Sequence, residues 1–324
     1  MARTDREVWF ITGATSGLGA ACAREALKAG KAVVAAGRRP EKVARVLGED
    51  EHLLIQQMDV LKLDTIREAV DAAVRKLGKI DVLLNNAGVF YAGYFENTSY
   101  AQWRSQMDIN FFGAMNVTRE VLPHMRKERR GLIINTGSSG GLFALEHASV
   151  YAAANFALEG WSESLRYDVA PFGIRVMLSE PGYFRSSILK PGRVVLPDLD
   201  IEDYRERNRE KIEMWKQIDN NAPGDPEKYA RALLEIVTWK DLPFRFMAGA
   251  DAIQFAEAKV RELQADIDRQ RGFSSMLNYD DGSGIDCFAM TQAKGRIQAP
   301  AGDGPESPAG MGGEEQDENR TEAG

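Results

Sequence analysis

Tyr151 and Asn155 lie four residues apart in YAAANFALEG, residues 151–160, a segment whose composition is typical of a helix. A phenol has an ordinary pKa near 10, so a tyrosine that exchanges protons at neutral pH needs a neighbour that favours its anion. Residues at i and i+4 share one helix face, and a cation at position 155 would give that help. The sequence has the uncharged amide of Asn155 there. The pair predicts either an altered acid–base site or a protein that has left this chemistry.

A second candidate site is a glycine-rich turn near the N-terminus. The stretch FITGATSGLGA, residues 10–20, places Gly13, Gly17 and Gly19 between an apolar run and a segment with helical spacing. Glycine lets the backbone approach a pyrophosphate, and the N-terminus of the following helix offers N–H groups and a positive dipole end. The turn therefore predicts a dinucleotide site.

The end of the second apolar run indicates which dinucleotide binds. A site for NAD usually has Asp or Glu about 20 residues beyond the glycine turn, where it binds the ribose hydroxyls. This sequence has Arg38 and Arg39, and the first acid after them is Glu41. A guanidinium binds a phosphate through charge-assisted, bidentate hydrogen bonds. We therefore predict NADP(H) as the cofactor.

These side chains must be positioned by strands and helices that alternate over the first 180 residues. The strand-like runs are continuously apolar, as in strands covered on both faces, and lie at 8–11, 32–37, 53–60, 80–88, 131–137 and 174–182. Helical spacing is found at 18–30, 65–78, 100–129 and 150–170, and later at 226–239 and 252–271. The alternation predicts an α/β fold, a doubly wound parallel sheet of Rossmann-like type.

The expected organisation is one domain over residues 1–272. Between residues 182 and 225 the apolar periodicity breaks down, which predicts an irregular substrate loop or lid. An edge strand is expected near 244–249. Residues 273–324 are predicted to be a largely disordered C-terminal extension, because the stretch 299–324 is rich in Gly, Pro and Glu.

Charge and composition argue against several classes of protein. The formal net charge is −7, and residues 299–324 hold seven acidic side chains against one basic one, so no basic face is expected for nucleic acid. No apolar run approaches the length of a membrane span, the N-terminal run is too short for a signal sequence, and two cysteines form no disulfide framework. No cluster of His and Cys suggests a metal site. We expect a cytoplasmic protein that binds no nucleic acid, membrane or metal.

Four motifs in order resemble the short-chain dehydrogenase/reductase family: Thr12-Gly13-Ala14-Thr15-Ser16-Gly17-Leu18-Gly19, Asn85-Asn86-Ala87-Gly88, Ser138 thirteen residues before Tyr151, and Pro181-Gly182. The resemblance spans residues 6–270. The stretches EPGYFRSS and GDPEKYARALLEI are similar to a subgroup related to 17β-hydroxysteroid dehydrogenase-like reductases. The family has a lysine where this chain has Asn155.

The resemblance implies a role for each matching position. Ser138 would hydrogen-bond the carbonyl of a substrate, Tyr151 would exchange a proton with it, and Asn110 would hold a water in a proton relay. Asn155 replaces the lysine that binds the nicotinamide ribose. The cofactor-binding positions would be Gly13, Thr15, Ser16, Gly17, Leu18, Gly19, Arg38, Arg39, Asp59, Val60, Asn86, Ala87, Gly88, Asn155, Pro181, Gly182 and Ser186.

The missing positive charge is expected to weaken proton transfer without abolishing it. An opposite charge nearby shifts such a pKa by ~1–3 units, so its loss corresponds to roughly a ten- to thousandfold slower proton-limited step. Reduction should suffer less than oxidation, because it begins with Tyr151 protonated. We therefore predict an NADPH-dependent carbonyl reductase. Three alternatives stay open: a non-redox isomerase, cyclase or lyase, a catalytically silent NADP(H)-binding protein, and a chain in which Asn155 was introduced to trap a complex.

Aromatic loops predict a bulky apolar or aromatic carbonyl substrate. They are residues 89–95, residues 140–147 and the segment after Gly182, with Phe90, Tyr91, Tyr94, Phe95, Phe143, Tyr183 and Trp215. His147, four residues before Tyr151, is interpreted either as a group that assists protonation or as a wall residue. The family resemblance implies a homodimer or homotetramer formed through the helices at 100–129 and 150–170.

Overall fold

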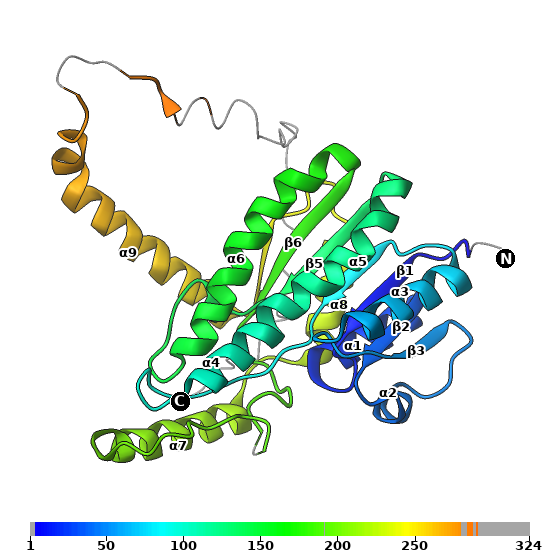
Figure 1. Cartoon of the computed structure of the whole chain (residues 1–324), viewed down its shortest axis with the longest axis horizontal. Helices are drawn as coiled ribbons and strands as arrows, with labels where there is room; N and C mark the ends of the chain where they lie inside the picture. The colour runs from blue at the N-terminus through cyan, green and yellow to red at the C-terminus, as the bar shows by residue number, and fades with distance from the viewer. Residues whose placement is uncertain (1–3, 191, 280–283, 288–289, 291–324) are drawn as a thin grey trace, which may run out of the picture.

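Parallel strands form one sheet in the order β3-β2-β1-β4-β5-β6-β7 in the computed structural model, which describes residues 4–190, 192–279, 284–287 and 290 (Figure 1). The strands of the described chain are β1 (Val8–Thr12), β2 (Ala32–Gly37), β3 (Leu53–Gln57), β4 (Val82–Asn85), β5 (Gly131–Thr136), β6 (Ile174–Pro181) and β7 (Arg245–Ala248). Every neighbouring pair is parallel. The predicted doubly wound α/β fold is confirmed.

Helices cover both faces of this sheet (Figure 1). In the described residues they are α1 (Gly17–Lys28), α2 (Pro40–Leu47), α3 (Leu63–Leu77), α4 (Tyr100–Met107), α5 (Gly113–Glu128), α6 (Ser149–Val169), α7 (Arg205–Asn221), α8 (Pro226–Ile236) and α9 (Ala250–Ser275). A π-helical turn, η1 (Asp108–Phe112), joins α4 to α5. Short 3₁₀ turns are η2 (Ser139–Gly141), η3 (Ala170–Phe172) and η4 (Glu202–Tyr204).

The continuous apolar runs make two cores, one on each side of the sheet. Successive side chains of a strand point to opposite faces. Val8 and Phe10 of β1 therefore pack in a cluster with residues of α3, α5 and α6, whereas Trp9 and Ile11 pack with residues of α1, α2 and α8. Helices bury both faces of the sheet, which is why these strands show no alternation of polar and apolar residues in the sequence.

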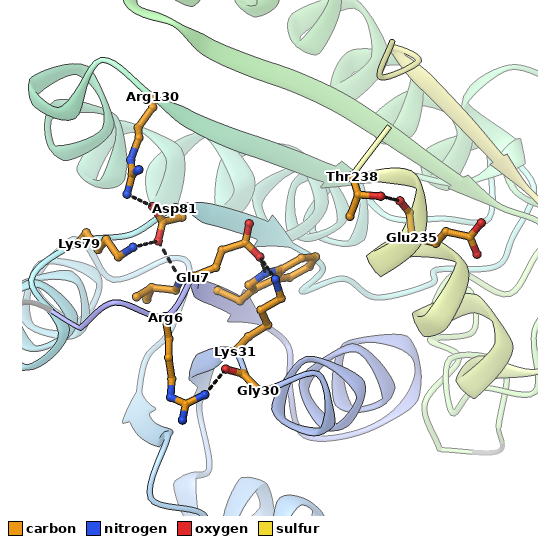
Figure 2. Close-up of polar contacts among 11 residues, drawn as sticks. Arg6, Glu7, Gly30, Lys31, Lys79, Asp81, Arg130, Glu235 and Thr238 are labelled. Atoms are coloured by element: carbon orange, nitrogen blue, oxygen red, sulfur yellow. Dashed lines mark hydrogen bonds and ion pairs between the residues drawn. The ribbon is translucent and has the colours of Figure 1, made fainter. Parts of the chain in front are cut away.

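Polar groups hold the N-terminal ends of the strands. Figure 2 shows Asp81 between Lys79 and Arg130, with N···O distances of 2.9 and 2.7 Å. Asp81 also accepts a hydrogen bond of 2.9 Å from the backbone N–H of Val8. A second ion pair joins Glu7 and Lys31 at 2.9 Å (Figure 2). These contacts tie β1 to the start of β4 and β5 and leave the opposite edge of the sheet for ligands.

The segment between residues 182 and 225 differs from its prediction, because it contains the 17-residue helix α7. This helix is rich in charged residues, and of its side chains Trp215 is deeply buried, at 3% exposure. A helix with so narrow an apolar stripe leaves almost no periodic signal in the sequence. The short helix α2 also lacked a prediction.

The other predicted elements lie close to their observed positions. The stretch 100–129 is helical but is interrupted by η1, and the expected edge strand near 244–249 is β7. The helix expected at 252–271 is α9, which continues to Ser275, so the proposed domain boundary at 272 falls inside it. The predicted disorder of 299–324 lies outside the described residues. None of the helices in the described ranges is long and apolar enough to cross a membrane.

Candidate active site

A cleft of about 320 Å³ opens at the C-terminal ends of β1, β2, β4, β5 and β6. This is the edge at which open α/β sheets bind ligands, and the volume is in the range of small-molecule sites. The cleft brings together nearly all the predicted site residues: Gly13, Thr15, Ser16, Gly17, Leu18, Arg38, Arg39, Asp59, Val60, Asn86, Ala87, Gly88, Asn110, Ser138, Tyr151, Asn155, Pro181, Gly182 and Ser186.

The glycine-rich turn presents bare backbone to this cleft. Gly13 and Gly17 have φ values of +69° and +59°, a region that other residues rarely adopt, and a Cβ added to Gly13 would lie 2.9 Å from the Cα of Ala87. Gly19 does not line the cleft: it packs against the Asn86 amide, which a Cβ there would displace. The turn and the N-terminus of α1 behind it fit the pyrophosphate of a dinucleotide.

Hydrogen bonds fix the turn to the end of β4. The Thr12 hydroxyl accepts from the backbone N–H groups of Asn86 and Ala87, at 2.9 and 3.0 Å. The Asn86 side chain in turn donates to the Thr12 carbonyl at 3.1 Å. The sequence motif with Asn86, Ala87 and Gly88 therefore braces the floor of the cleft, as well as lining it.

Arg38 and Arg39 follow β2 and lie at the end of the cleft beside Asp59 and Val60. Both arginines are exposed, and neither has an ion-pair partner among the described residues. The Asp59 carboxylate forms no ion pair with either arginine and accepts a hydrogen bond of 3.1 Å from the N–H of Leu61. Two cations without an acidic partner in the described chain thus lie at this end of the cleft.

Tyr151 and Ser138 form the polar centre of the cleft. Tyr151 lies in the first turn of α6, and Ser138 follows β5, where its hydroxyl accepts a hydrogen bond of 3.1 Å from the N–H of Gly140. Burial raises the pKa of the Tyr151 phenol above its ordinary value, while the side chains of Ser138 and Asn155 act in the opposite direction. The phenol is therefore protonated at neutral pH, as a general acid must be.

Asn155 brings no positive charge to the phenol of Tyr151. Its side-chain amide donates a hydrogen bond of 2.9 Å to the backbone carbonyl of Tyr151, one turn earlier in α6. The described residues that line the cleft include no lysine, and no cation contributes to the pKa of Tyr151. The charge missing from the sequence is thus not supplied by another element of the described chain.

Buried amides fix the position of helix α6 against the sheet. Asn85 of β4 donates to Asn135 of β5 at 2.9 Å, and Asn135 donates to the Ser162 hydroxyl at 2.8 Å. Ser162 is three turns after Tyr151 on the same helix. This chain of hydrogen bonds fixes the register of α6, and with it the point at which the phenol enters the cleft.

Asn110 is held in the π-helical turn. Its side chain accepts from the N–H of Val89 at 2.9 Å and donates to the carbonyl of Val89 at 3.1 Å. The π turn aims this side chain at the loop after β4. Asn110 therefore clamps the backbone of a cleft residue.

The loop after β6 closes over the glycine-rich turn. The Ser187 hydroxyl donates to that of Ser16 at 2.9 Å. Asp251 of α9 accepts a 2.6 Å hydrogen bond from the N–H of Tyr183 and packs on Gly182, where there is no room for a Cβ. Burial, Asp251 and Tyr151 together raise the pKa of Tyr183 to about 12. Tyr183 is thus a second protonated phenol facing the site.

Residues 7–193 match the short chain dehydrogenase family. The chain belongs to this family. A 3-ketodihydrosphingosine reductase of Bacteroides thetaiotaomicron is 34% identical over 255 residues, which are 78% of this chain and 92% of the relative. The crystal structure of a short-chain dehydrogenase from Streptomyces avermitilis has a TM-score of 0.77 at 32% identity, covering 85% of this chain and all of that one.

A third similar protein has a nucleotide bound. A short-chain dehydrogenase/reductase from Burkholderia phymatum, solved in complex with NAD, has a TM-score of 0.70 at 25% identity, and the match covers 83% of this chain and 97% of that one. Both the fold and the family therefore support an oxidoreductase of the short-chain dehydrogenase type.

Only part of the predicted aromatic lining faces the cleft of this short-chain dehydrogenase. Phe90, Tyr183 and Trp215 line it, but Tyr91, Tyr94, Phe95 and Phe143 do not. The hydroxyl of Tyr91 bonds Ser105, the hydroxyl of Tyr94 bonds Glu146, Phe95 packs on Trp103, and Phe143 packs on Phe255. Loop residues have no fixed periodicity, so the sequence does not tell which rings point inward.

Other lining residues were not found from the sequence. The apolar wall also includes Leu145, Ala148, Phe184, Ile188 and Leu189, and Arg193 lies at its outer part. These side chains come from the loops around Tyr151 and after β6. Phe184, Ile188, Leu189 and Arg193 lie in the segment predicted to be the substrate loop. Leu145 lies in the predicted pocket loop at 140–147, and Ala148 had no signal in the sequence.

His147 is not in the cleft, although it is close in sequence to Tyr151. Its side chain is buried, at 2% exposure, and lies between the loop before α6 and helix α7. Glu146 beside it points outward and forms ion pairs with Arg207 and Lys211 of α7, which hold its pKa at about 2. Both residues therefore join α7 to the body of the protein and do not face substrate.

A buried carboxylate pair lies directly behind the site. Glu180, next to Pro181, and Glu159, one turn after Asn155, both approach Arg245 of β7, at 3.3 and 3.2 Å. Burial, followed by the nearby charge of Glu159, raises the pKa of Glu180 to about 9. This cluster went unpredicted because its members are far apart in the sequence.

Within the described residues, no group of His, Cys, Asp and Glu has the arrangement of a metal site.

Proposed function

We propose that this short-chain dehydrogenase is an NADPH-dependent reductase of a bulky apolar or aromatic carbonyl compound. The observation on which the proposal rests is the Tyr151 phenol, kept protonated by burial in a cleft that is continuous with the glycine-rich turn. The name of the Bacteroides relative, a reductase of a keto compound, supports a carbonyl substrate. The likeness of two motifs to 17β-hydroxysteroid dehydrogenase-like reductases supports the same substrate class.

Two free arginines support NADPH over NADH. Arg38 and Arg39 lie at the ribose end of the cleft without acidic partners in the described chain, and no Asp or Glu follows β2 before Glu41. A guanidinium that has no partner is available for a 2′-phosphate. The backbone of the glycine turn would hold the pyrophosphate, and Ser186 and Gly182 would lie beside the nicotinamide.

The residues of this chain then perform the proton chemistry. A bound nicotinamide cofactor would supply the hydride for the carbonyl carbon. Ser138 would hydrogen-bond the carbonyl oxygen, and Tyr151 would donate its proton to that oxygen as charge develops there. Phe90, Ile188 and Trp215 would exclude water and hold an apolar substrate.

A protonated phenol without a cationic partner favours the direction of reduction. Reduction uses the proton that Tyr151 already holds, whereas oxidation requires the tyrosinate, which burial disfavours and no nearby cation stabilises. We therefore propose that Asn155 makes the enzyme slow in oxidation and moderately slow in reduction.

Stopped-flow absorbance with a panel of aryl and long-chain ketones tests this function. NADPH absorbance should fall on mixing, NADH should be used poorly, and Tyr151→Phe should lower kcat by about 10²- to 10⁴-fold, the usual contribution of a general acid. Undiminished turnover in Tyr151→Phe, or a preference for NADH, would contradict the proposal. Turnover of a compound without any absorbance change would indicate a non-redox enzyme, and nucleotide binding without turnover would indicate a silent protein.

We also propose a homodimer or homotetramer, formed through α4, α5 and α6. Phe112, Phe156 and Tyr167 are exposed on this side of the molecule, at 44%, 43% and 42%. Exposed aromatic residues gathered on one face are typical of an interface. A cytoplasmic location stays a prediction of the sequence.

A further inference from the structure

Helix α7 is joined to the body of the protein through a buried histidine. His147 lies in the loop before α6, and its backbone has φ of +64°, which is rare for a residue other than glycine. Its carbonyl accepts a hydrogen bond of 3.0 Å from the N–H of Gly93. An unusual backbone conformation at a fully buried polar side chain calls for a physical reason beyond packing.

The hydrogen bonds of the imidazole define its protonation state. The indole N–H of Trp215 points to Nδ1 of His147 at 3.2 Å, and an indole nitrogen can only donate. Nδ1 must therefore be the unprotonated acceptor. The ring hydrogen is then on Nε2, which donates to Oδ1 of Asn208 at 2.9 Å. Both partners, Trp215 and Asn208, belong to α7.

Aromatic contacts continue this connection to the catalytic phenol. The Trp215 ring meets Phe90 edge to face, with centroids 5.1 Å apart, and Phe90 meets Tyr151 in the same way at 4.8 Å. All three rings line the cleft. Edge-to-face pairs of this kind have a preferred geometry, so the orientation of one ring constrains the next.

We infer that His147, in its neutral Nε2–H form, is a positioning residue that holds Trp215 and α7 against Phe90 and so sets the substrate wall and the orientation of Tyr151. The inference rests on the proposed function where substrate turnover is the readout. His147 contacts no substrate and transfers no proton to it. Its effect reaches the site through Trp215 and Phe90.

This arrangement makes the contact between His147 and Trp215 of α7 sensitive to weak acid. Protonation of Nδ1 of His147 would place its N–H against the indole N–H of Trp215. Because two donors cannot bond each other, this contact would be lost. Burial lowers the pKa of His147, the Asn208 hydrogen bond and Glu146 raise it, and Lys211 lowers it. The other groups facing this region are Arg207 of α7 and Tyr94, whose ring is 5.0 Å from the imidazole. Because the pKa of His147 is depressed in the folded protein, its contact with Trp215 is favoured at neutral pH and weakens as the pH falls below about 6.5.

Two substitutions separate the two nitrogens. His147→Asn retains an acceptor oxygen near the position of Nδ1, and asparagine tolerates the positive φ. His147→Gln instead extends its amide toward Asn208 and leaves the indole N–H without an acceptor. We expect the asparagine variant to rescue most of the activity, and the glutamine variant to raise the KM for ketone about tenfold with a smaller change in kcat. Equal KM values in the two variants would overturn the inference.

The pH profile supplies a readout that a purely structural histidine would not change. In the unmodified chain the KM for ketone should rise as pH falls from 7 to 5. In Trp215→Phe, which retains a ring but has no N–H, this acid limb should flatten, and the difference between His147→Asn and His147→Gln should disappear. His52→Gln, in the loop before β3, is the matched control and should keep the acid limb. An acid limb that persists in Trp215→Phe would overturn the inference.

Nitrogen-15 NMR of histidine-labelled protein gives a test without turnover. The chain has three histidines, so the signal lost in His147→Asn identifies position 147. The Nε2–H tautomer should be present at pH 7, with Nδ1 shifted as an acceptor. An Nδ1–H tautomer would overturn the inference even in an active enzyme. The expected tautomer in a protein that reduces no ketone would leave the positioning of Trp215 intact and reject the proposed function alone.

Discussion

The amide at position 155 determines how much of the proton chemistry this chain retains. The phenol of Tyr151 is present and protonated, but the side chain of Asn155, one turn later, is an uncharged amide that donates to the Tyr151 backbone carbonyl. A lysine at that position would reach further into the cleft and add a charge. The cleft thus holds the phenol, but no cation of the described chain acts on its pKa.

Replacing Asn155 with lysine should therefore increase the rate. A cation near Tyr151 lowers its pKa by ~1–3 units, so we expect a gain of about tenfold or more in the proton-limited step, larger for alcohol oxidation than for ketone reduction. Steady-state kinetics in both directions measure it. Asn155→Gln lengthens the side chain without charge and serves as the control. An equal gain in both variants would show that the length of the side chain, and not its charge, causes the effect.

Arg38 and Arg39 should determine the choice of nucleotide. Removing a charge-assisted phosphate contact costs about 1.5–3 kcal/mol, so Arg38→Ala should raise the Kd for NADPH by about 10- to 100-fold and leave that for NADH nearly unchanged. Arg39→Ala tests whether the second guanidinium shares the contact. Fluorescence titration of both nucleotides gives the ratio of the Kd values, and Arg45→Ala, at an exposed arginine of α2 that does not line the cleft, is the control. An equal rise in the Kd for NADPH and for NADH would show that these arginines do not bind the 2′-phosphate.

At the scale of elements, the cluster behind β6 links the stability of the sheet to pH. Glu180 is fully buried between Arg245 and Glu159, and burial is the first cause of its raised pKa. The folded protein therefore holds a proton that the unfolded chain releases above about pH 4.5. Stability from this proton is complete in acid and is lost as pH rises toward 9.

Glu180→Gln should remove this dependence. We expect the Tm of the unmodified chain to fall between pH 5 and pH 9 by more than that of the variant, because glutamine has no proton to lose and leaves Arg245 with Glu159 and Glu163. Thermal unfolding at a series of pH values measures the difference. Glu163→Gln, at a more exposed member of the cluster, is the matched control. Parallel curves for Glu180→Gln and the unmodified chain would contradict the raised pKa.

The sequence was most informative where an element is buried along its whole length. The strands that end at the cleft are apolar over most of their length, so β1, β2, β4, β5 and β6 could be predicted close to their observed bounds. Their ends place Gly13, Asn86, Ser138 and Pro181 at one edge of the sheet. Helix α7 could not be predicted, since only the narrow apolar stripe around Trp215 is buried and polar contacts such as that of Asn208 with His147 leave no pattern in the sequence.

The site was predictable as far as its motifs reach. The site residues predicted from the motifs line the cleft, except Gly19, whose missing side chain makes room for Asn86. Groups brought together only by packing were out of reach: Glu159 with Glu180, and His147 with Trp215. Sequence distance gives no information about such pairs, because they depend on how helices lie on the finished sheet.

At the scale of the whole molecule, the turn η1 and helix α6 leave the aromatic side chains of Phe112, Phe156 and Tyr167 exposed. Phe156 of α6 is 43% exposed on the outer side of the same helix that presents Tyr151 to the cleft. An interface on α6 would therefore support the helix that positions the phenol, and assembly and activity should be lost together.

Phe156→Glu should yield a smaller species. A charge in the centre of an apolar interface is costly, so we expect the assembly to dissociate at micromolar concentration, with reduced turnover. Light scattering coupled to size exclusion gives the mass. Trp239→Glu, at a residue 51% exposed just after α8, is the control for a surface charge elsewhere. An unmodified chain that is already monomeric would reject the proposed assembly.

The π-helical turn at 108–112 has a consequence for how this enzyme can change. Such a turn contains one residue more than an α-helical turn would need, and each residue advances the helix by about 100°. Deleting a single residue there would let α4 and α5 merge into one regular rod, swing Asn110 away from Val89 and free the loop beneath the substrate. A lineage could thus lose or regain this clamp by the deletion or insertion of one codon.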